Sequence, residues 1–197
     1  MEDHGGDSRK ENLVLALCGM PGSGKGEIAE IASELSIPIL SMGDIVRERF
    51  SADCPGRAKA ETGIFADEQR KAHGKDIWAR RLIDRMNGII EGGARIAIID
   101  GLRSRYESDL FREAWGDRFK VLAVHSSPGD RYRRLLVRGR GDDPSNRDEF
   151  DERDSRELGW GLGDVISTAD IMMVNDGSIE VLMDAARDLL LSLEGGG

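Results

Sequence analysis

The sequence predicts an α/β protein in which helices cover a doubly wound, parallel, five-stranded sheet. Short apolar runs recur at residues 13–18, 37–40, 96–100, 119–127 and 169–174. Strands that are buried on both faces have this composition. Segments with helical spacing lie between several of these runs, and the alternation of strand and helix is typical of a parallel sheet.

The length and composition favour one globular domain. With 197 residues, 39% of them hydrophobic and 33% charged, the chain can bury a core, which we expect in residues 12–194 behind a flexible tail at residues 1–11. No apolar run approaches the roughly 20 residues of a membrane span. The net charge of −9 argues against general nucleic-acid binding. Cys18 and Cys54 lack metal-ligand spacing, so we expect free thiols in a reducing cytoplasm.

The first strand runs into a glycine-rich turn with the pattern G-x-x-x-x-G-K, from Gly19 to Lys25. Glycine lets the backbone N–H groups curl around a polyphosphate. A segment with helical spacing follows at residues 28–35, so that its N-terminus also faces the phosphates and Lys25 reaches their oxygens. The residues expected to bind the nucleotide here are Gly19, Met20, Pro21, Gly22, Ser23, Gly24, Lys25, Gly26 and Glu27.

The residue after the lysine narrows the class of protein. Most phosphate loops carry Ser or Thr there, whose hydroxyl binds Mg²⁺, whereas this chain carries Gly26, which argues against GTPases and typical AAA ATPases. The run Gly-Met-Pro-Gly-Ser-Gly-Lys-Gly resembles the loop of adenylate kinase and its nucleoside monophosphate kinase relatives. The resemblance extends over most of residues 12–193 and implies a P-loop kinase fold, ATP as the donor, and Mg²⁺ held largely through water.

The second strand leads into a segment that resembles the start of the acceptor-binding helices of these kinases. The segment is Ser-Met-Gly-Asp-Ile-Val-Arg at residues 41–47. The resemblance implies that Arg47 grips the acceptor phosphate. Asp44 serves positioning if the acceptor is a phosphate, or accepts a proton if the acceptor is a hydroxyl. We expect an acceptor-binding insertion at about residues 43–77, with short helices joined by turns over residues 51–77.

A helix is predicted from residue 77 to residue 90, with Trp78, Leu82 and Met86 on one face and arginines on another. The strand at 96–100 then ends in Asp100, which is the Walker B pattern of a carboxylate beside the phosphate loop where Mg²⁺ sits. Adenylate kinases continue with Asp-Gly-Phe-Pro-Arg. This chain has Asp-Gly-Leu-Arg-Ser-Arg at 100–105, so the resemblance implies a phosphate contact by Arg103 first and Arg105 second.

An arginine-rich segment follows the fourth strand. Its eight arginines are Arg131, Arg133, Arg134, Arg138, Arg140, Arg147, Arg153 and Arg156. Residues 138–146 resemble the mobile lid of nucleoside monophosphate kinases, and we place the lid at about residues 138–156. Guanidinium groups that close over a phosphoryl group in transfer stabilise its charge and exclude water. Arg138, Arg140 and Arg153 are the predicted catalytic arginines, with Arg156 behind them; Asp142, Asp143 and Glu152 are expected to hold them in the empty site.

The fifth strand ends in Asn175-Asp176-Gly177-Ser178. The resemblance implies that Asn175 and Gly177 lie against the adenine base of the nucleotide. Ser178 is a good N-cap for a last helix that runs through residue 193.

These observations predict an ATP- and Mg²⁺-dependent kinase with Lys25 and Asp100 at its centre, acting on a small phosphorylated acceptor, foremost a nucleoside monophosphate. Two alternatives stay open. One is dephospho-coenzyme A kinase-like phosphorylation of a hydroxyl, and the other is a P-loop ATPase or switch that acts with a protein or RNA partner. The details also resemble a little-characterised archaeal family related to adenylate and dephospho-coenzyme A kinases.

Overall fold

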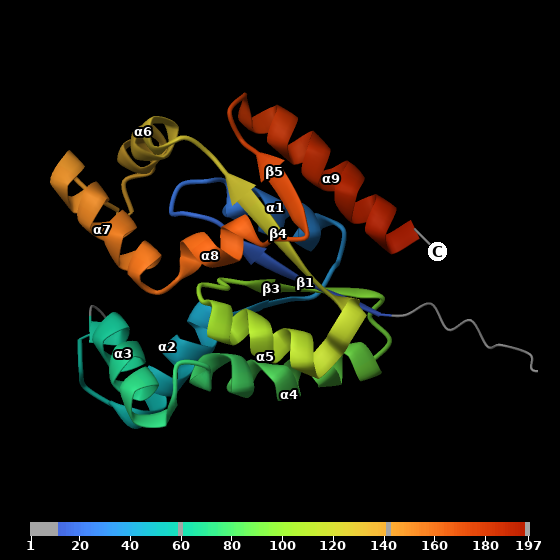
Figure 1. Ribbon diagram of the computed structural model, residues 1–197, viewed down its shortest axis with the longest axis horizontal. Coiled ribbons are helices and arrows are strands. Elements are labelled where there is room, and N and C mark those ends of the chain that lie inside the picture. The colour runs from blue at the N-terminus through green and yellow to red at the C-terminus, as the bar shows by residue number, and fades with distance from the viewer. Residues whose placement is uncertain (1–11, 59–60, 141–142, 196–197) are drawn as a thin grey trace, which may run out of the picture.

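Strand β1 (Leu13–Cys18) lies at the centre of a parallel sheet, between the strand that ends at Asp100 and the strand that begins at Phe119. The computed structural model describes residues 12–58, 61–140 and 143–195, so the predicted tail lies outside the described residues. The described residues form a five-stranded sheet in the order β2-β3-β1-β4-β5 (Figure 1). The other strands are β2 (Ile39–Ser41), β3 (Ile96–Asp100), β4 (Phe119–His125) and β5 (Ile171–Val174). The predicted doubly wound parallel sheet is confirmed.

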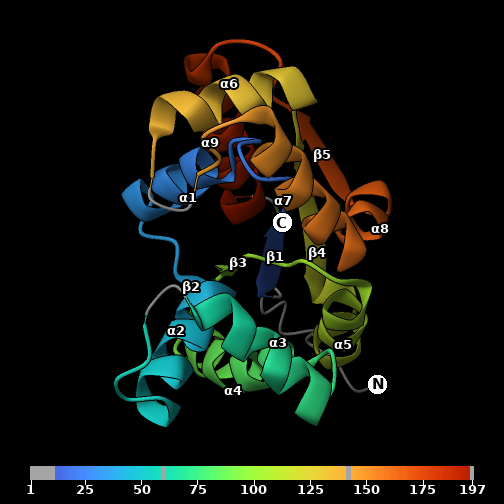
Figure 2. The same ribbon diagram turned by 90° about the vertical axis from the view of Figure 1, so that its left-hand side faces the viewer.

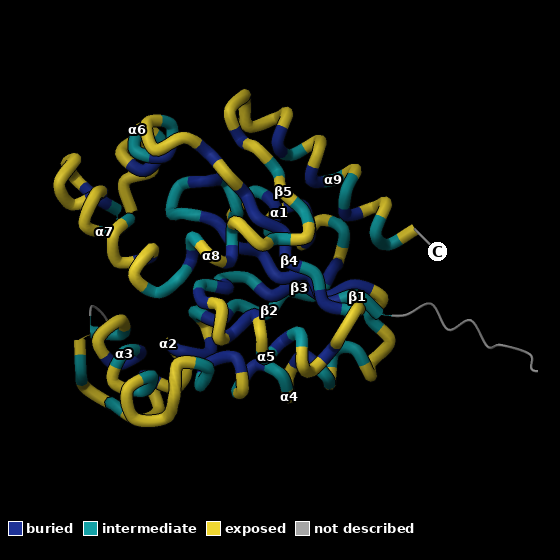
Figure 3. Tube along the Cα trace, viewed as in Figure 1, coloured by how far each residue is buried: buried dark blue, intermediate teal, exposed yellow. Residues whose placement is uncertain are grey.

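Helices cover both faces of this sheet because successive strand residues point to opposite sides. Leu15 and Leu17 pack with α1 (Lys25–Glu34) and α9 (Ile179–Gly195) on one face. Val14 and Ala16 pack on the other face. The helices there are α2 (Met42–Asp53), α4 (Ile77–Glu91), α5 (Arg105–Trp115), which a 3₁₀ turn η2 (Gly116–Arg118) follows, and α8 (Leu162–Ser167). The Cα trace in Figure 3 is correspondingly buried along most of β1, β3 and β4 and largely exposed on the outer faces of the helices.

The segment at 51–77 differs from the prediction. Among the described residues of this segment, the end of α2 and the twelve-residue helix α3 (Thr62–His73), which continues through Gly63, stand in place of several short helices. Tertiary packing explains the difference, since the Phe65 ring lies 5.4 Å from Phe50 and 6.0 Å from Trp78. These contacts bury one face of α3 and offset the weak helix propensity of glycine. The helix predicted at 77–90 is confirmed by α4, in which the common face of Trp78, Leu82 and Met86 is buried.

Helices α6 (Pro128–Arg138) and α7 (Arg147–Gly159) stand apart from the two layers, beside the ends of the strands (Figure 2). Pro128 opens α6, since its fixed φ suits the first helical turn. No helix among the described residues is both long and apolar enough to cross a membrane. Cys18, the last residue of β1, is fully buried, and burial raises the pKa of its thiol to about 12; Cys54, just after α2, is half-buried.

Candidate phosphate-binding site

The glycine loop lies between β1 and α1, in a conformation that only glycine allows. Gly19, Gly22 and Gly24 have φ values of +147°, +79° and +110°. A Cβ at Gly19 would lie 2.4 Å from the Val124 carbonyl oxygen, and one at Gly24 would lie 2.5 Å from Asn175 Nδ2. The loop therefore packs directly against the end of β4 and against the residue after β5, with no room for side chains.

Lys25 begins α1 and folds back over the loop. Its Nζ donates to the carbonyl oxygens of Gly19, at 2.5 Å, and of Met20, at 3.4 Å. Burial lowers the pKa of Lys25, and the negative charge of Asp100 opposes this shift. Asp100 lies opposite Leu17 in the register of β3 on β1, so the sheet itself places this carboxylate beside the loop, as predicted.

Asp143 organises two of the predicted lid arginines. Arg138 donates through Nε at 2.8 Å and through Nη2 at 2.5 Å, and Arg153 Nη1 lies 3.3 Å away. The Asp143 carboxylate is only 2% exposed, and it also accepts from the backbone N–H of Arg140 at 3.0 Å. The hydrogen bond from Arg138 is the main cause that lowers the pKa of Asp143 to about 2. The predicted pairing is thus present for Asp143, whereas Gly141 and Asp142 lie outside the described residues.

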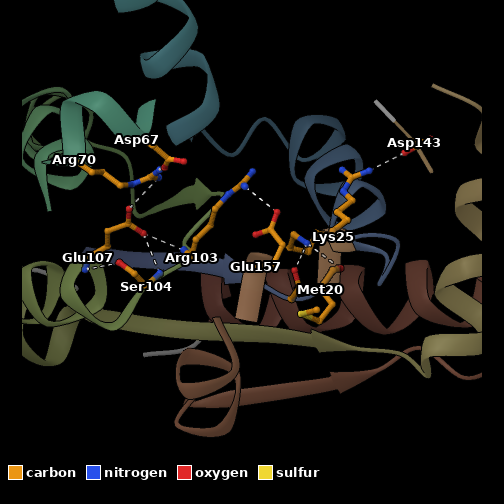
Figure 4. A network of polar contacts seen from close by, with 11 residues as sticks. Met20, Lys25, Asp67, Arg70, Arg103, Ser104, Glu107, Asp143 and Glu157 are labelled. Carbon is orange, nitrogen blue, oxygen red and sulfur yellow. Dashed lines mark hydrogen bonds and ion pairs between the residues drawn. The ribbon is translucent and has the colours of Figure 1, made fainter. Parts of the chain in front are cut away.

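Arg103 reaches the same region from the loop after β3. Its Nη1 donates to Glu157 Oε1 at 2.9 Å, and its guanidinium lies 5.4 Å from the centre of the Trp160 ring. Figure 4 shows Glu157 between Arg103 and Lys25. Glu157 and Trp160 come from the end of α7, and neither was predicted from the sequence.

Two further arginines hold the framework of the site. Arg131 is buried, and it binds Asp154 through both terminal nitrogens, at 2.8 and 2.5 Å, and the Pro21 carbonyl oxygen at 3.2 Å. Arg134 donates to Asn175 Oδ1 at 3.1 Å. Their spacing on α6, at i and i+3, marks one helix face. The sequence shows this spacing. It does not show the partners of the two arginines, because these lie far away along the chain.

Asn175 is a link in this framework. Its Nδ2 donates to the Ser23 carbonyl oxygen at 2.8 Å, and its backbone N–H donates to His125 O at 2.7 Å. The predicted base-binding residue therefore ties the phosphate loop to the ends of β4 and β5, while it also lines the cleft described next.

These groups line one open cleft of about 910 Å³. Within the described residues, seven cationic and four acidic side chains line it, although the whole chain has a net charge of −9. The cations are Lys25, Arg103, Arg133, Arg134, Arg138, Arg140 and Arg153, and the acids are Glu27, Glu30, Asp100 and Glu157. A locally positive cleft in an acidic protein favours polyanionic ligands.

Other predicted residues are not brought to this cleft. Asp44 and Arg47 lie on α2, where they form an i,i+3 ion pair at 2.5 Å, and both side chains are more than 60% exposed. Arg105 pairs with Asp109 on the surface of α5. Gly177 lies between β5 and α9 and is not among the residues that line the cleft.

The residues present fit a phosphate ligand. Ser23 Oγ is buried and has no hydrogen-bond partner among the described residues, so a polar group is left for a ligand at the centre of the loop. For a metal, no group of three or more His, Cys, Asp or Glu side chains gathers anywhere in the described parts of the chain. The single carboxylate of Asp100 fits Mg²⁺, which keeps several waters and takes phosphate oxygens as ligands.

Comparisons with known proteins agree with this geometry. A family model described as AAA domain matches residues 18–151. A UPF0200 protein of Methanoculleus marisnigri is 41% identical over 182 residues, which is 92% of this chain and 97% of that protein.

Among solved structures, a sugar kinase of a Janibacter species has a TM-score of 0.59 at 20% identity, over 91% of this chain and 94% of that one. A shikimate kinase of Bacteroides thetaiotaomicron has a TM-score of 0.57 at 17% identity, over 91% and 98%. These likenesses show a P-loop kinase fold. The family model is described as an AAA domain, whereas Gly26 predicts that the chain is not a typical AAA ATPase.

Proposed function

This chain belongs to the archaeal UPF0200 family, and we propose that it is an ATP- and Mg²⁺-dependent kinase that transfers the γ-phosphoryl group to a small phosphorylated acceptor, foremost a nucleoside monophosphate. One observation carries the proposal. A single cleft brings together the glycine loop with Lys25, the carboxylate of Asp100 and six arginines. Phosphoryl transfer needs these parts, because its catalysis is almost entirely positioning and charge stabilisation.

The donor side of the proposed reaction lies at the loop. The loop N–H groups and the N-terminus of α1 bind the phosphates of ATP, and Lys25 moves from the carbonyl oxygens of Gly19 and Met20 to phosphate oxygens. Asp100 would hold Mg²⁺ through water, and the ion would supply charge neutralisation at the phosphates.

The transferred phosphoryl group is stabilised by Arg138, Arg140 and Arg153. Asp143 fixes two of these guanidinium groups before any nucleotide binds. Their positions are therefore preorganised, and preorganised charges stabilise a transition state without further rearrangement.

On the acceptor side, Arg103 contacts a phosphate at the floor of the cleft, and Arg47 grips the acceptor phosphate. Because Arg47 is exposed and paired with Asp44, its participation requires α2 to move toward the cleft. On the nucleoside side, Asn175 and Gly177 would border the adenine ring, with Asn175 fixed through the Ser23 carbonyl.

The direct test is product analysis. Purified protein is incubated with ATP, Mg²⁺ and each of a panel of nucleoside monophosphates and dephospho-coenzyme A, and Lys25→Ala serves as the control. We expect a nucleoside diphosphate that the control does not form. ADP and free phosphate alone would contradict the kinase and would favour an ATPase or switch that acts with a protein or RNA partner.

Transfer to a hydroxyl is the second candidate, and the position of Arg47 favours it. The residue expected to grip an acceptor phosphate is paired with Asp44 and lies outside the cleft. In this reading Asp44, which also lies outside the cleft, accepts the proton of the hydroxyl after α2 moves. Asp44→Asn then abolishes turnover, and ³¹P NMR of the product shows a phosphate ester in place of a diphosphate.

A further inference from the structure

The buried carboxylate of Glu107 holds the backbone of Arg103 in place. Glu107 Oε2 accepts from the N–H of Arg103 at 3.0 Å and from the N–H of Ser104 at 3.1 Å, and Glu107 is 1% exposed. The capping box of α5, formed by Ser104 and Glu107, thereby sets where the Arg103 side chain begins. It leaves the long side chain itself free to rotate unless other contacts hold it.

Two residues at the end of α7 make those contacts. Glu157 binds Arg103 Nη1 at 2.9 Å through a carboxylate that is only 7% exposed. The Trp160 ring lies 5.4 Å from the Arg103 guanidinium carbon. A charge-assisted hydrogen bond and an aromatic face together restrict both the direction and the tilt of the planar guanidinium group.

Glu157 also offsets the repulsion between two cations of the cleft. Arg103 and Lys25 face the same part of the cleft, and their positive charges repel each other. Arg103 lowers the pKa of Lys25, and Glu157 raises it. A carboxylate between the two cations (Figure 4) allows both to stay near the path of the phosphoryl group before ATP arrives.

We propose that Glu157 and Trp160 are positioning residues for Arg103. They orient its guanidinium toward the acceptor phosphate and do not touch the reacting atoms themselves. The inference rests on the proposed function, because it takes Arg103 as a residue that contacts the acceptor phosphate. It also explains why α7 matters beyond the arginines it carries, since the end of this helix holds a phosphate-binding arginine from another part of the chain.

A double-mutant cycle tests the proposal. ADP release is measured for wild type, Glu157→Gln, Arg103→Ala and the double variant. We expect Glu157→Gln to lower kcat by about 10- to 100-fold, the range that misplacement of a catalytic group produces, with KM for ATP changed less than about threefold. Because Glu157 acts through Arg103, the double variant should be no slower than Arg103→Ala alone. Losses that multiply in the double variant would overturn the proposal.

Matched controls separate positioning from folding. Glu113→Gln removes the same charge from the exposed face of α5, and it should leave kcat unchanged. Trp160→Leu should lower kcat with KM unchanged, while thermal melting shows that each variant is folded. Glu157→Asp keeps the charge and should recover part of the activity that Glu157→Gln loses. A kcat for Glu157→Asp no higher than that of Glu157→Gln contradicts positioning by charge.

A spectroscopic measurement gives a readout that needs no turnover. Because the Arg103 guanidinium lies 5.4 Å from the centre of the Trp160 ring, Arg103→Ala should change the tryptophan emission of the ligand-free protein. The same substitution should leave the emission of Trp160→Phe unchanged, and an emission that Arg103→Ala does not change in the wild-type background would contradict the inference. ADP release measures phosphoryl transfer and ATP hydrolysis together. A missing phosphorylated product would therefore contradict only the kinase proposal. Losses of kcat that multiply in the double variant would contradict only the proposal that Glu157 positions Arg103.

Discussion

The ion pairs of Arg131 and Arg138 on α6 differ in burial from the ion pair of Arg47 on α2. Arg131 and Arg138 bind carboxylates that are largely buried, with Asp154 16% and Asp143 2% exposed. On α2, Arg47 and Asp44, which are three positions apart, form an exposed ion pair. Exposed pairs of this kind contribute little to stability and break readily, whereas buried pairs fix a geometry. Under the proposed function, the arginines of α6 would therefore be preorganised, whereas Arg47 of α2 would have to rearrange to bind the acceptor.

We expect the largest effect when the buried ion pair of Arg131 and Asp154 is broken. Arg131→Met leaves the Asp154 carboxylate without its partner in a mostly buried place. We expect the free energy of unfolding to fall by about 3–5 kcal/mol, measured by urea denaturation. The double variant Arg131→Met, Asp154→Leu should recover most of that loss, and an equally unstable double variant would show that the pair is not the cause.

The next largest effect concerns activity. Lys25→Ala removes the cation that lies on the glycine loop, and we expect turnover to fall by at least about 100-fold. The protein should remain folded, because Lys25 contacts only backbone carbonyl groups of its own loop in the contacts described above. Steady-state ADP release together with a thermal melt checks both halves of this prediction.

Asp143 allows a test by pH. Its pKa is about 2 in the folded protein against 3.8 for the free group. A lowered carboxyl pKa contributes stability that is complete above the unfolded pKa and is lost as the pH falls through the folded value. Asp143→Asn should therefore cost about 2 kcal/mol at pH 7.

The same prediction fixes how that cost changes with pH. The difference between wild type and variant should shrink as the pH falls from about 4 to about 2, where the wild-type carboxyl becomes protonated. Urea denaturation across this range measures it. A difference that is independent of pH would mean that Arg138 and Arg153 do not depend on the charge of Asp143.

The smallest effect is expected on the acceptor side. Arg47→Ala should change the free energy of unfolding by less than about 0.5 kcal/mol, because its ion pair is exposed. If α2 moves to bind the acceptor, the KM for the acceptor rises about tenfold while basal ADP release stays the same. An unchanged KM would leave Arg47 without a role and would favour the hydroxyl acceptor.

The parts of this molecule that the sequence predicts are those determined by local pattern. The apolar run of β1, the glycines that need positive φ, and the acid at the end of β3 all act through neighbours in the chain or through the regular register of a sheet. The placement of Asp100 beside Leu17 follows from parallel pairing alone.

The residues that sequence analysis missed depend on distant partners. Glu157 meets Arg103 across 54 positions of the chain, and Arg134 meets Asn175 across 41. Periodicity carries no information about such pairs. The single helix α3 was missed for the same reason, since the rings of Phe50 and Trp78 stabilise it from neighbouring helices.

The contrast between Cys18 and Cys54 has a practical consequence. Electrophiles such as maleimides react with the thiolate, and the buried Cys18 thiol, with a pKa of about 12, offers almost none at neutral pH. Cys54 lies half-buried at the end of α2 and is the thiol open to reaction. A fluorophore or spin label can therefore be attached at the end of α2 in the unmutated chain while the glycine loop stays chemically untouched.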